Sequence, residues 1–164
     1  MSNNVIKNND EIIAKKSKNL LERIPTKKNR KQVENALEFS IKMHHGQTRK
    51  SGLPFVSHCI DVANILIDWN MDHTTVVSAL LHDVVEDTEV KLSDIEEEFG
   101  SDVALLVDGV TKVENIAFRS KKHKQAENFT KLFLSLARDL RVIIIKFADR
   151  LNNMETIQYL SSKN

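Results

Sequence analysis

One histidine and three acids lie within six consecutive positions near the middle of the chain, in the stretch ALLHDVVEDTEV at residues 79–90. If this stretch is helical, spacings of three and four residues turn four side chains toward one side of the helix: His82, Asp83, Glu86 and Asp87. Three carboxylates so close together repel one another unless a cation joins them. The pattern therefore indicates a place for a salt bridge, for water or for a metal ion, and leaves the choice between them open.

Two further residues could complete a metal site with the pair His82–Asp83. A transition metal is commonly held by neutral imidazole nitrogens and carboxylate oxygens at about 2.0–2.2 Å. His58 and Asp149 each stand beside apolar residues in segments expected to be core helices, where an unpaired charge is costly. Taken alone, however, His58 is explained more simply as a structural histidine, and Asp149 as a local ion pair with Arg150.

The elements expected to position these residues are helices. Only 4 Gly and 2 Pro stand in a chain of 164 residues, so the turn-rich composition of an all-β protein is missing. Apolar residues recur at helical spacing in successive segments, and Pro25, Gly46 and Gly100 stand where three of these segments should end. The expected helices cover residues 10–24, 29–45, 56–69, 73 into the motif at 79–90, 92–99, 102–113, about 125–137, and 140–160.

Two further segments need a separate interpretation. The stretch LRVIIIKFADRLNNMETIQYL has the β-branched run typical of a strand. Its apolar residues nevertheless keep helical spacing over a length too great for one typical strand: Ile144, Phe147, Ala148, Leu151 and Met154. The stretch QTRKSGLPF at 47–55 is typical of a polar loop, of the kind that often displays binding groups. The sequence therefore predicts an all-α fold with a polar loop in its first half.

Composition limits the class of protein. A length of 164 residues fits one domain with a sizeable core, and a net charge of +1 gives no overall attraction to nucleic acid or to a membrane. The single cysteine, Cys59, cannot form an internal disulfide and is expected to be a small packing residue. The N-terminus lacks an apolar signal core, and no apolar run approaches the roughly 20 residues of a membrane span. We therefore expect a soluble cytoplasmic protein with no nucleic-acid or membrane partner.

Five sequence blocks, taken in their order, resemble the hydrolase domain of the RelA/SpoT family, within the HD phosphohydrolase superfamily. They are HGQTRKSGLPFVSH at 45–58, LLHDVVEDT at 80–88, LVDGVTKV at 106–113, QAENFTKL at 125–132 and VIIIKFADRLNNMETI at 142–157. The ordered set is far more specific than any one block. The resemblance implies an HD-domain helical bundle that removes pyrophosphate from the 3′ position of ppGpp and pppGpp, with one bound manganese ion (Mn²⁺).

The resemblance also implies roles for the residues of the central motif. The metal ligands of the family match four residues of this chain: His58, His82, Asp83 and Asp149. Its acidic catalytic pair matches Glu86 and Asp87. Two imidazoles and two carboxylates would bring a divalent ion near electroneutrality and leave positions open for water and a phosphate oxygen. The ion would acidify water and polarise the phosphorus–oxygen bond, while the acidic pair orients the water or takes its proton.

The substrate-binding positions of the family fall in the polar loop and the last helix, and match Arg49, Lys50, Ser51, Asn153 and Thr156. A guanidinium is flat and stacks well on a base, so the resemblance implies that Arg49 packs against guanine while Lys50 supplies a point charge for phosphate. Two positions depart from the family pattern, which usually has histidine and arginine where this chain has Asn152 and Glu155. An acid in place of a base is expected to weaken phosphate binding or change the nucleotide chosen.

Residues 1–27 are expected to form an N-terminal helix and tail, and residues 28–164 the HD hydrolase domain without the C-terminal helices of the family. The chain would then be a small hydrolase or a fragment of a bifunctional enzyme, and an open apolar edge would allow a homo-oligomer. The leading hypothesis is a manganese-dependent (p)ppGpp 3′-pyrophosphohydrolase. Two alternatives stay open: an HD-type hydrolase of another nucleotide, such as an adenine alarmone or NADPH, and a truncated nucleotide-binding regulator without turnover.

Overall fold

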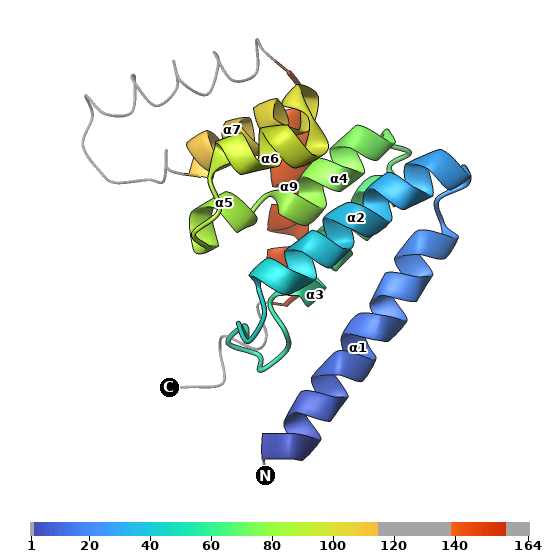
Figure 1. The fold of residues 1–164 in the computed structure, drawn as a ribbon, viewed down its shortest axis with the longest axis vertical. Helices are drawn as coiled ribbons and strands as arrows, with labels where there is room; N and C mark the ends of the chain where they lie inside the picture. Colours follow the sequence, from blue (N-terminus) through green and yellow to red (C-terminus); the bar gives the residue numbers. More distant parts are fainter. Residues whose placement is uncertain (1, 115–138, 157–164) are drawn as a thin grey trace, which may run out of the picture.

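The computed structural model describes residues 2–114 and 139–156, and these residues are almost entirely helical (Figure 1). Within these two ranges the only β pairing is an isolated bridge between Thr48 and Pro54 in the polar loop. The predicted all-α fold is therefore confirmed. The helix expected at about 125–137 and the block QAENFTKL lie outside the described residues.

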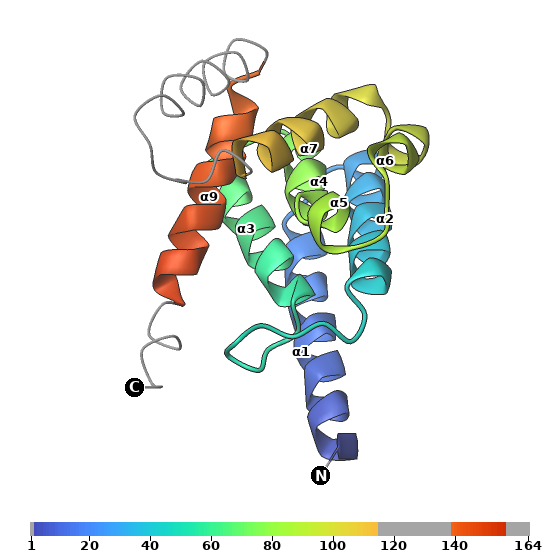
Figure 2. The same ribbon diagram turned by 90° about the vertical axis from the view of Figure 1, so that its left-hand side faces the viewer.

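The helices are given in the order in which they follow one another along the chain. Their bounds are α1 (Ser2–Glu22), α2 (Lys27–Met43), α3 (Val56–Asp68), α4 (His73–Leu81), α5 (Val84–Asp87), α6 (Leu92–Phe99), α7 (Ser101–Glu114) and α9 (Arg141–Glu155). Helices α3 and α4 pack against each other at the centre, with α2 on one side and α7 and α9 on the other. Figure 2 shows α9 running beside α3, although the two helices lie far apart in the sequence.

Local signals set several of these ends. The Thr26 side chain accepts a hydrogen bond from the Asn29 amide (3.3 Å) and so caps the start of α2, directly after Pro25. Gly46 and Gly100, at the predicted stops, have positive φ angles of 79° and 91°. A residue with a side chain rarely adopts this backbone conformation, so glycine is favoured at both ends.

The central helix α4 is buried on every side, since each residue from Thr75 to Leu81 is buried. A helix that is apolar all round belongs in the interior of a bundle rather than on its surface. Asp72 caps its start by accepting from the Thr75 amide and hydroxyl (3.1 and 2.7 Å). His82 follows the last residue of this helix directly, and is therefore delivered into the core.

The sequence analysis considered the central motif as one helix. In the structure it is interrupted, because the chain turns at His82 and Asp83. Helix α4 ends at Leu81 and the short helix α5 begins at Val84. The Asp83 carbonyl accepts hydrogen bonds from the amides of Glu86 and Asp87 (3.2 and 2.9 Å), and these bonds start α5. The histidine and the three acids thus come from a junction between two helices.

A glycine allows α9 to approach α7 closely. A Cβ atom at Gly109 of α7 would lie 2.5 Å from a methyl carbon of Val142 in α9, a distance that real side chains do not reach. Glycine inside a helix costs about 1 kcal/mol relative to alanine. The close contact between α7 and α9 accounts for its presence there, and it holds α9 against the core with Asp149 on the inner face.

Helix α1 joins the same core as the other helices. Its Leu20 is fully buried, and Lys16 forms an ion pair with Asp61 of α3 at 2.5 Å. The division of the chain between residues 27 and 28 stays a prediction. Among the described residues, no helix combines the length and the apolar character that crossing a membrane requires.

Candidate active site

Two imidazoles and two carboxylates from three separate parts of the chain meet inside the bundle. His58 comes from α3, His82 and Asp83 from the junction between α4 and α5, and Asp149 from α9. The Nε2 atom of His58 lies 3.2 Å from Asp149 Oδ1 and 3.9 Å from Asp83 Oδ2. His82 Nε2 lies 3.0 Å from Asp83 Oδ1. The structure therefore brings together all four residues predicted to hold a metal ion.

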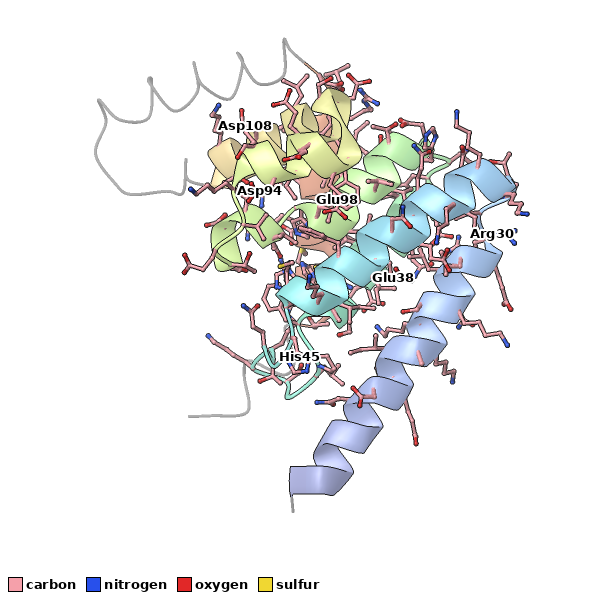
Figure 3. All side chains as sticks on the ribbon, viewed as in Figure 1. Arg30, Glu38, His45, Asp94, Glu98 and Asp108 are labelled. Atoms are coloured by element: carbon pink, nitrogen blue, oxygen red, sulfur yellow. The ribbon has the colours of Figure 1, made fainter. Side chains whose placement is uncertain are left out.

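Burial distinguishes this cluster from the many other acids of the chain. Glu38 on α2 and Asp94 and Glu98 on α6 stand on the outside of the bundle, exposed to solvent (Figure 3). By contrast, the side chains of His58 and Asp149 are only 2% and 5% exposed. Buried charges occur where they are paired or bind a metal, so this cluster requires a cation.

The arrangement of donor atoms fits a divalent cation. His82 Nδ1 donates to the Ala79 carbonyl at 2.7 Å, which leaves the lone pair on Nε2 directed into the cluster. That Nε2 atom is buried and has no hydrogen-bond partner in the described part of the chain. The ligand atoms of His58, His82 and Asp149 all lie within 4.8 Å of one another. Neutral imidazoles and carboxylates with one unpartnered nitrogen among them form a suitable set for a divalent metal.

Asn152 orients the first of the two histidines. Its Oδ1 accepts a hydrogen bond from His58 Nδ1 at 2.7 Å, and both side chains are buried. With the proton held on Nδ1, the lone pair of His58 is on Nε2, which faces Asp149 and Asp83. Asn152, one of the two departures from the family pattern, therefore supports a predicted metal ligand. The other departure, Glu155, is exposed at the end of α9.

Asp149 is held from both of its oxygens. The Lys146 ammonium, one turn earlier on α9 and buried, donates to Oδ2 at 3.1 Å. The Asn153 amide, one turn later, donates to Oδ1 at 2.7 Å, and Arg49 of the polar loop donates to Asn153 Oδ1 at 2.5 Å. A chain of hydrogen bonds thus runs from the loop to a predicted metal ligand and fixes the direction of its carboxylate.

Without a metal ion, a proton on His82 balances the negative charges of Asp83 and Asp149. Burial lowers the pKa of His82, but the carboxylates of Asp83 and Asp149 outweigh burial and raise this pKa to about 9. Burial raises the pKa of both Asp83 and Asp149, yet the neighbouring cationic and hydrogen-bonding groups hold the pKa of each carboxyl below its ordinary value. A proton on His82 therefore supplies the positive charge that the acids require, and a metal ion would compete with it.

The cluster opens into a cavity of about 200 Å³. Both residues predicted to form the catalytic pair reach it, together with two of the predicted substrate-binding residues and the aromatic ring of the loop. Its lining comprises Arg49, Phe55, His58, Asp83, Glu86, Asp87, Asp149 and Asn153. The chemistry available at this cavity is that of a metal-assisted hydrolysis, with exposed carboxylates beside the ligands that can accept a proton.

Three residues predicted to bind substrate do not line the cavity. Lys50 is exposed at the tip of the loop, and Ser51 is half-buried beside it. The Thr156 hydroxyl donates to the carbonyls of Asn152 and Asn153, at 3.1 and 3.2 Å, and so bonds to its own helix. Their assignments stay predictions, as do those of the ligands and of the acidic pair.

Three residues of this site were not predicted from the sequence. Asn152 and Lys146 stand three positions after and before Asp149, a spacing that could have placed them on the same face of α9. Gln47 donates to the Asp87 carbonyl at 3.0 Å and accepts from His44 Nδ1 at 2.8 Å. It thereby ties the polar loop to the end of α5, a contact for which the sequence carries no signal.

Replacing Asn152 by leucine should weaken metal binding about 10–100-fold, the usual cost of losing a partner behind a metal-bound histidine. The leucine cannot accept the Nδ1 proton, so His58 is no longer held with its Nε2 lone pair toward the cluster. Calorimetric titration with Mn²⁺, the ion that the resemblance implies, measures the effect. Asn152→Asp keeps an acceptor and should bind within a few-fold of the original chain, while Asn35→Leu at an exposed position of α2 serves as control. Equal affinity in the Asn152→Leu variant would contradict this role.

Metal binding should strengthen as the pH rises. The proton on His82 and a metal ion compete for the same Nε2 atom, and the pKa of about 9 means that this proton is present at neutral pH. Between about pH 6 and pH 8, apparent affinity should therefore rise about tenfold per unit, with about one proton released per ion. Titrations in buffers of different ionisation enthalpy count the released proton. His45→Gln, which changes an exposed histidine (Figure 3), should keep the slope, and an affinity independent of pH would exclude this competition.

Comparison with known proteins places this geometry in a family. A family model described as "HD domain" matches residues 36–164. The bifunctional (p)ppGpp synthase/hydrolase SpoT of Escherichia coli K12 is 50% identical over 114 residues, which is 70% of this chain and 16% of that protein. The guanosine-3′,5′-bis(diphosphate) 3′-pyrophosphohydrolase of Vibrio cholerae is 51% identical over 114 residues, with the same coverage.

A solved structure gives an independent comparison that covers most of both chains. It was reported for a metazoan ortholog of SpoT that hydrolyses ppGpp, and it matches with a TM-score of 0.64 and 34% identity over 82% of this chain and 72% of that one. The chain spans only about one sixth of the length of the curated SpoT relatives. The family match covers well over half of the chain, and the described helices carry the predicted histidines and aspartates to one place. The chain therefore belongs to the HD domain family, together with SpoT and its metazoan ortholog.

Proposed function

We propose that this chain is a manganese-dependent hydrolase that removes pyrophosphate from the 3′ position of ppGpp and pppGpp. One observation carries the proposal: His58, His82, Asp83 and Asp149 form one cluster, and three of them line a cavity whose wall also holds Glu86 and Asp87. The names of the relatives support it, since SpoT is a (p)ppGpp synthase/hydrolase and its metazoan ortholog hydrolyses ppGpp.

The residues divide into those that would hold the ion and those that would move a proton. His58, His82, Asp83 and Asp149 would hold a divalent ion, which supplies Lewis-acid activation of water and of the phosphoryl group. Glu86 and Asp87 lie one turn beyond Asp83, and their amides are fixed to its carbonyl. Either carboxylate can therefore orient a water molecule at the cavity and accept its proton, which then leaves to solvent because both side chains are exposed.

The reaction balances without any further reactant. The water oxygen attacks the phosphorus that is bonded to the 3′ oxygen, and the bond between that phosphorus and the 3′ oxygen breaks. The 3′ oxygen takes a proton and becomes the hydroxyl of GDP or GTP, while the water oxygen is retained in pyrophosphate. The acidic pair receives one proton from the water in each turnover.

The cavity fits the reacting end of the substrate rather than the whole nucleotide. At about 200 Å³ it is smaller than the roughly 300–1,000 Å³ typical of small-molecule sites. Arg49 lies at its wall, where a guanidinium can meet an anionic phosphate. Two hydrogen bonds through Asn153 connect this arginine to Asp149. A phosphate bound by Arg49 would therefore act, through Asn153, on the position of a metal ligand. Stacking of Arg49 on the guanine stays a prediction.

Product analysis tests the proposal directly. Purified chain with Mn²⁺ should convert ppGpp to GDP and pyrophosphate, and in ¹⁸O-labelled water the label should appear in pyrophosphate only. The adenine counterpart and NADPH at matched concentrations test the choice of nucleotide, and faster turnover of either would replace the guanine assignment. Tight binding of ppGpp without product over hours would favour the regulatory alternative, and release of orthophosphate would contradict the assigned bond.

A further inference from the structure

A sulfur atom lies beside the predicted metal centre and has no part in the proposed reaction. Cys59 follows His58 on α3 and is fully buried. Its sulfur, a nitrogen of His82 and a carboxylate oxygen of Asp83 all lie within 4.8 Å of one another. Because Cys59 is the only cysteine of the sequence, every sulfur–metal signal of this chain can be assigned to it. The expectation that Cys59 is only a packing residue therefore leaves out its position.

The two sets of donor atoms overlap at the second histidine. One set is His58, His82 and Asp149, and the other is Cys59, His82 and Asp83. Since His82 Nδ1 is committed to the Ala79 carbonyl, only Nε2 can bind a metal. This nitrogen is buried in a side chain that is 1% exposed, and it has no hydrogen-bond partner within the described ranges. A single lone pair serves both sets, so an ion in one excludes an ion in the other.

The two sets differ in the ions they prefer. Oxygen and imidazole ligands suit hard and borderline ions such as Mn²⁺, whereas a thiolate selects softer ions. Zinc takes cysteine sulfur at about 2.3 Å and histidine nitrogen at about 2.0–2.1 Å, so its donors stand roughly 3–4 Å apart. We propose that Cys59, His82 and Asp83 form a second, overlapping coordination set that takes a thiophilic divalent ion of the zinc and cadmium class.

The thiol loses its proton when the sulfur binds such an ion. Burial, with the Asp83 carboxylate as the second cause, raises the pKa of the Cys59 thiol. Binding then forms one sulfur–metal bond and releases the thiol proton to solvent, with no oxidant or reductant involved.

An ion in the second set would stop hydrolysis, and this consequence rests on the proposed function. The ion would take the shared His82 nitrogen away from the first set and leave only His58 and Asp149 there. Asp149 would remain bound to Lys146 and Asn153, so the fold would be kept while the reaction is lost. The choice between the two sets therefore makes the centre sensitive to which metal is present.

Cobalt(II) tests the coordination without any turnover. Cobalt replaces zinc in thiolate sites and then shows a sulfur-to-metal charge-transfer band in the near ultraviolet. The original chain should show this band and Cys59→Ser should lack it, whereas Asp149→Asn, which changes only the first set, should keep it. No band in the original chain would overturn the proposal even if the serine variant fails to fold. Loss of the band in Asp149→Asn would also overturn it, because sulfur and Asp149 would then share one ion.

Affinities and inhibition complete the test. Zn²⁺ affinity should fall at least about tenfold in Cys59→Ser. This is the smallest loss usual for removing a residue that hydrogen-bonds to a metal ligand, and Cys59 would be a ligand itself. Mn²⁺ affinity should change less than threefold. Stoichiometric Zn²⁺ should lower the ppGpp turnover of the original chain, and Cys59→Ser should keep a larger fraction of its own zinc-free rate. Equal Zn²⁺ affinities would overturn the second set, whereas a chain that binds cobalt through sulfur but never hydrolyses ppGpp would overturn only the proposed function.

Discussion

Replacing Asp83 by alanine should remove both the bound divalent ion and the hydrolysis of ppGpp. Asp83 lies near both imidazoles, 3.0 Å from His82 Nε2 and 3.9 Å from His58 Nε2. Without its carboxylate, the set loses a ligand and half of the negative charge that balances a divalent cation. We expect Mn²⁺ affinity to fall more than about 100-fold and turnover to fall to background. This loss exceeds the one usual for removing a residue that only hydrogen-bonds to a metal ligand.

The control for this variant must separate the metal from the fold. Asp102→Ala removes an exposed carboxylate at the start of α7 and should leave metal affinity and turnover unchanged. Circular dichroism and thermal unfolding of the metal-free proteins show whether Asp83→Ala keeps its helices. A chelator should abolish the turnover of the original chain, and added Mn²⁺ should restore it. Full turnover after chelation, or in Asp83→Ala, would exclude the predicted role of the metal.

The fold could be predicted because its signals are local. Apolar residues at helical spacing, with Pro25, Gly46 and Gly100 at the ends, give most of the helices that the structure describes, although α1 begins at Ser2 rather than at residue 10. The break between α4 and α5 at His82 and Asp83 could not be predicted from these local signals. The helical spacing of the motif continues through it, and the break depends on the Asp83 carbonyl starting a new turn with the amides of Glu86 and Asp87.

The site could be predicted only in part. The five ordered blocks predict the metal ligands, but they do not predict the side chains that hydrogen-bond to these ligands and orient them. The hydrogen bond between His58 and Asn152 joins residues 94 positions apart and exists because α9 packs against α3. Lys146 interrupts an apolar run in the sequence. In the structure it is buried against Asp149, where it balances charge. Contacts between helices thus assign roles that spacing within one helix leaves open.

Neutralising the acidic pair should stop the chemistry while leaving the metal bound. Glu86→Gln and Asp87→Asn keep the size of each side chain and remove its ability to accept a proton, which general-base catalysis makes worth about 100- to 10,000-fold in turnover. Mn²⁺ affinity should stay within a few-fold, since neither residue lies in the ligand cluster. Glu89→Gln, an exposed acid just beyond α5, is the matched control and should keep its rate. If one of the two variants alone loses turnover, that residue takes the proton. If both keep it, the water is activated without either acid, and the catalytic role of the pair is wrong.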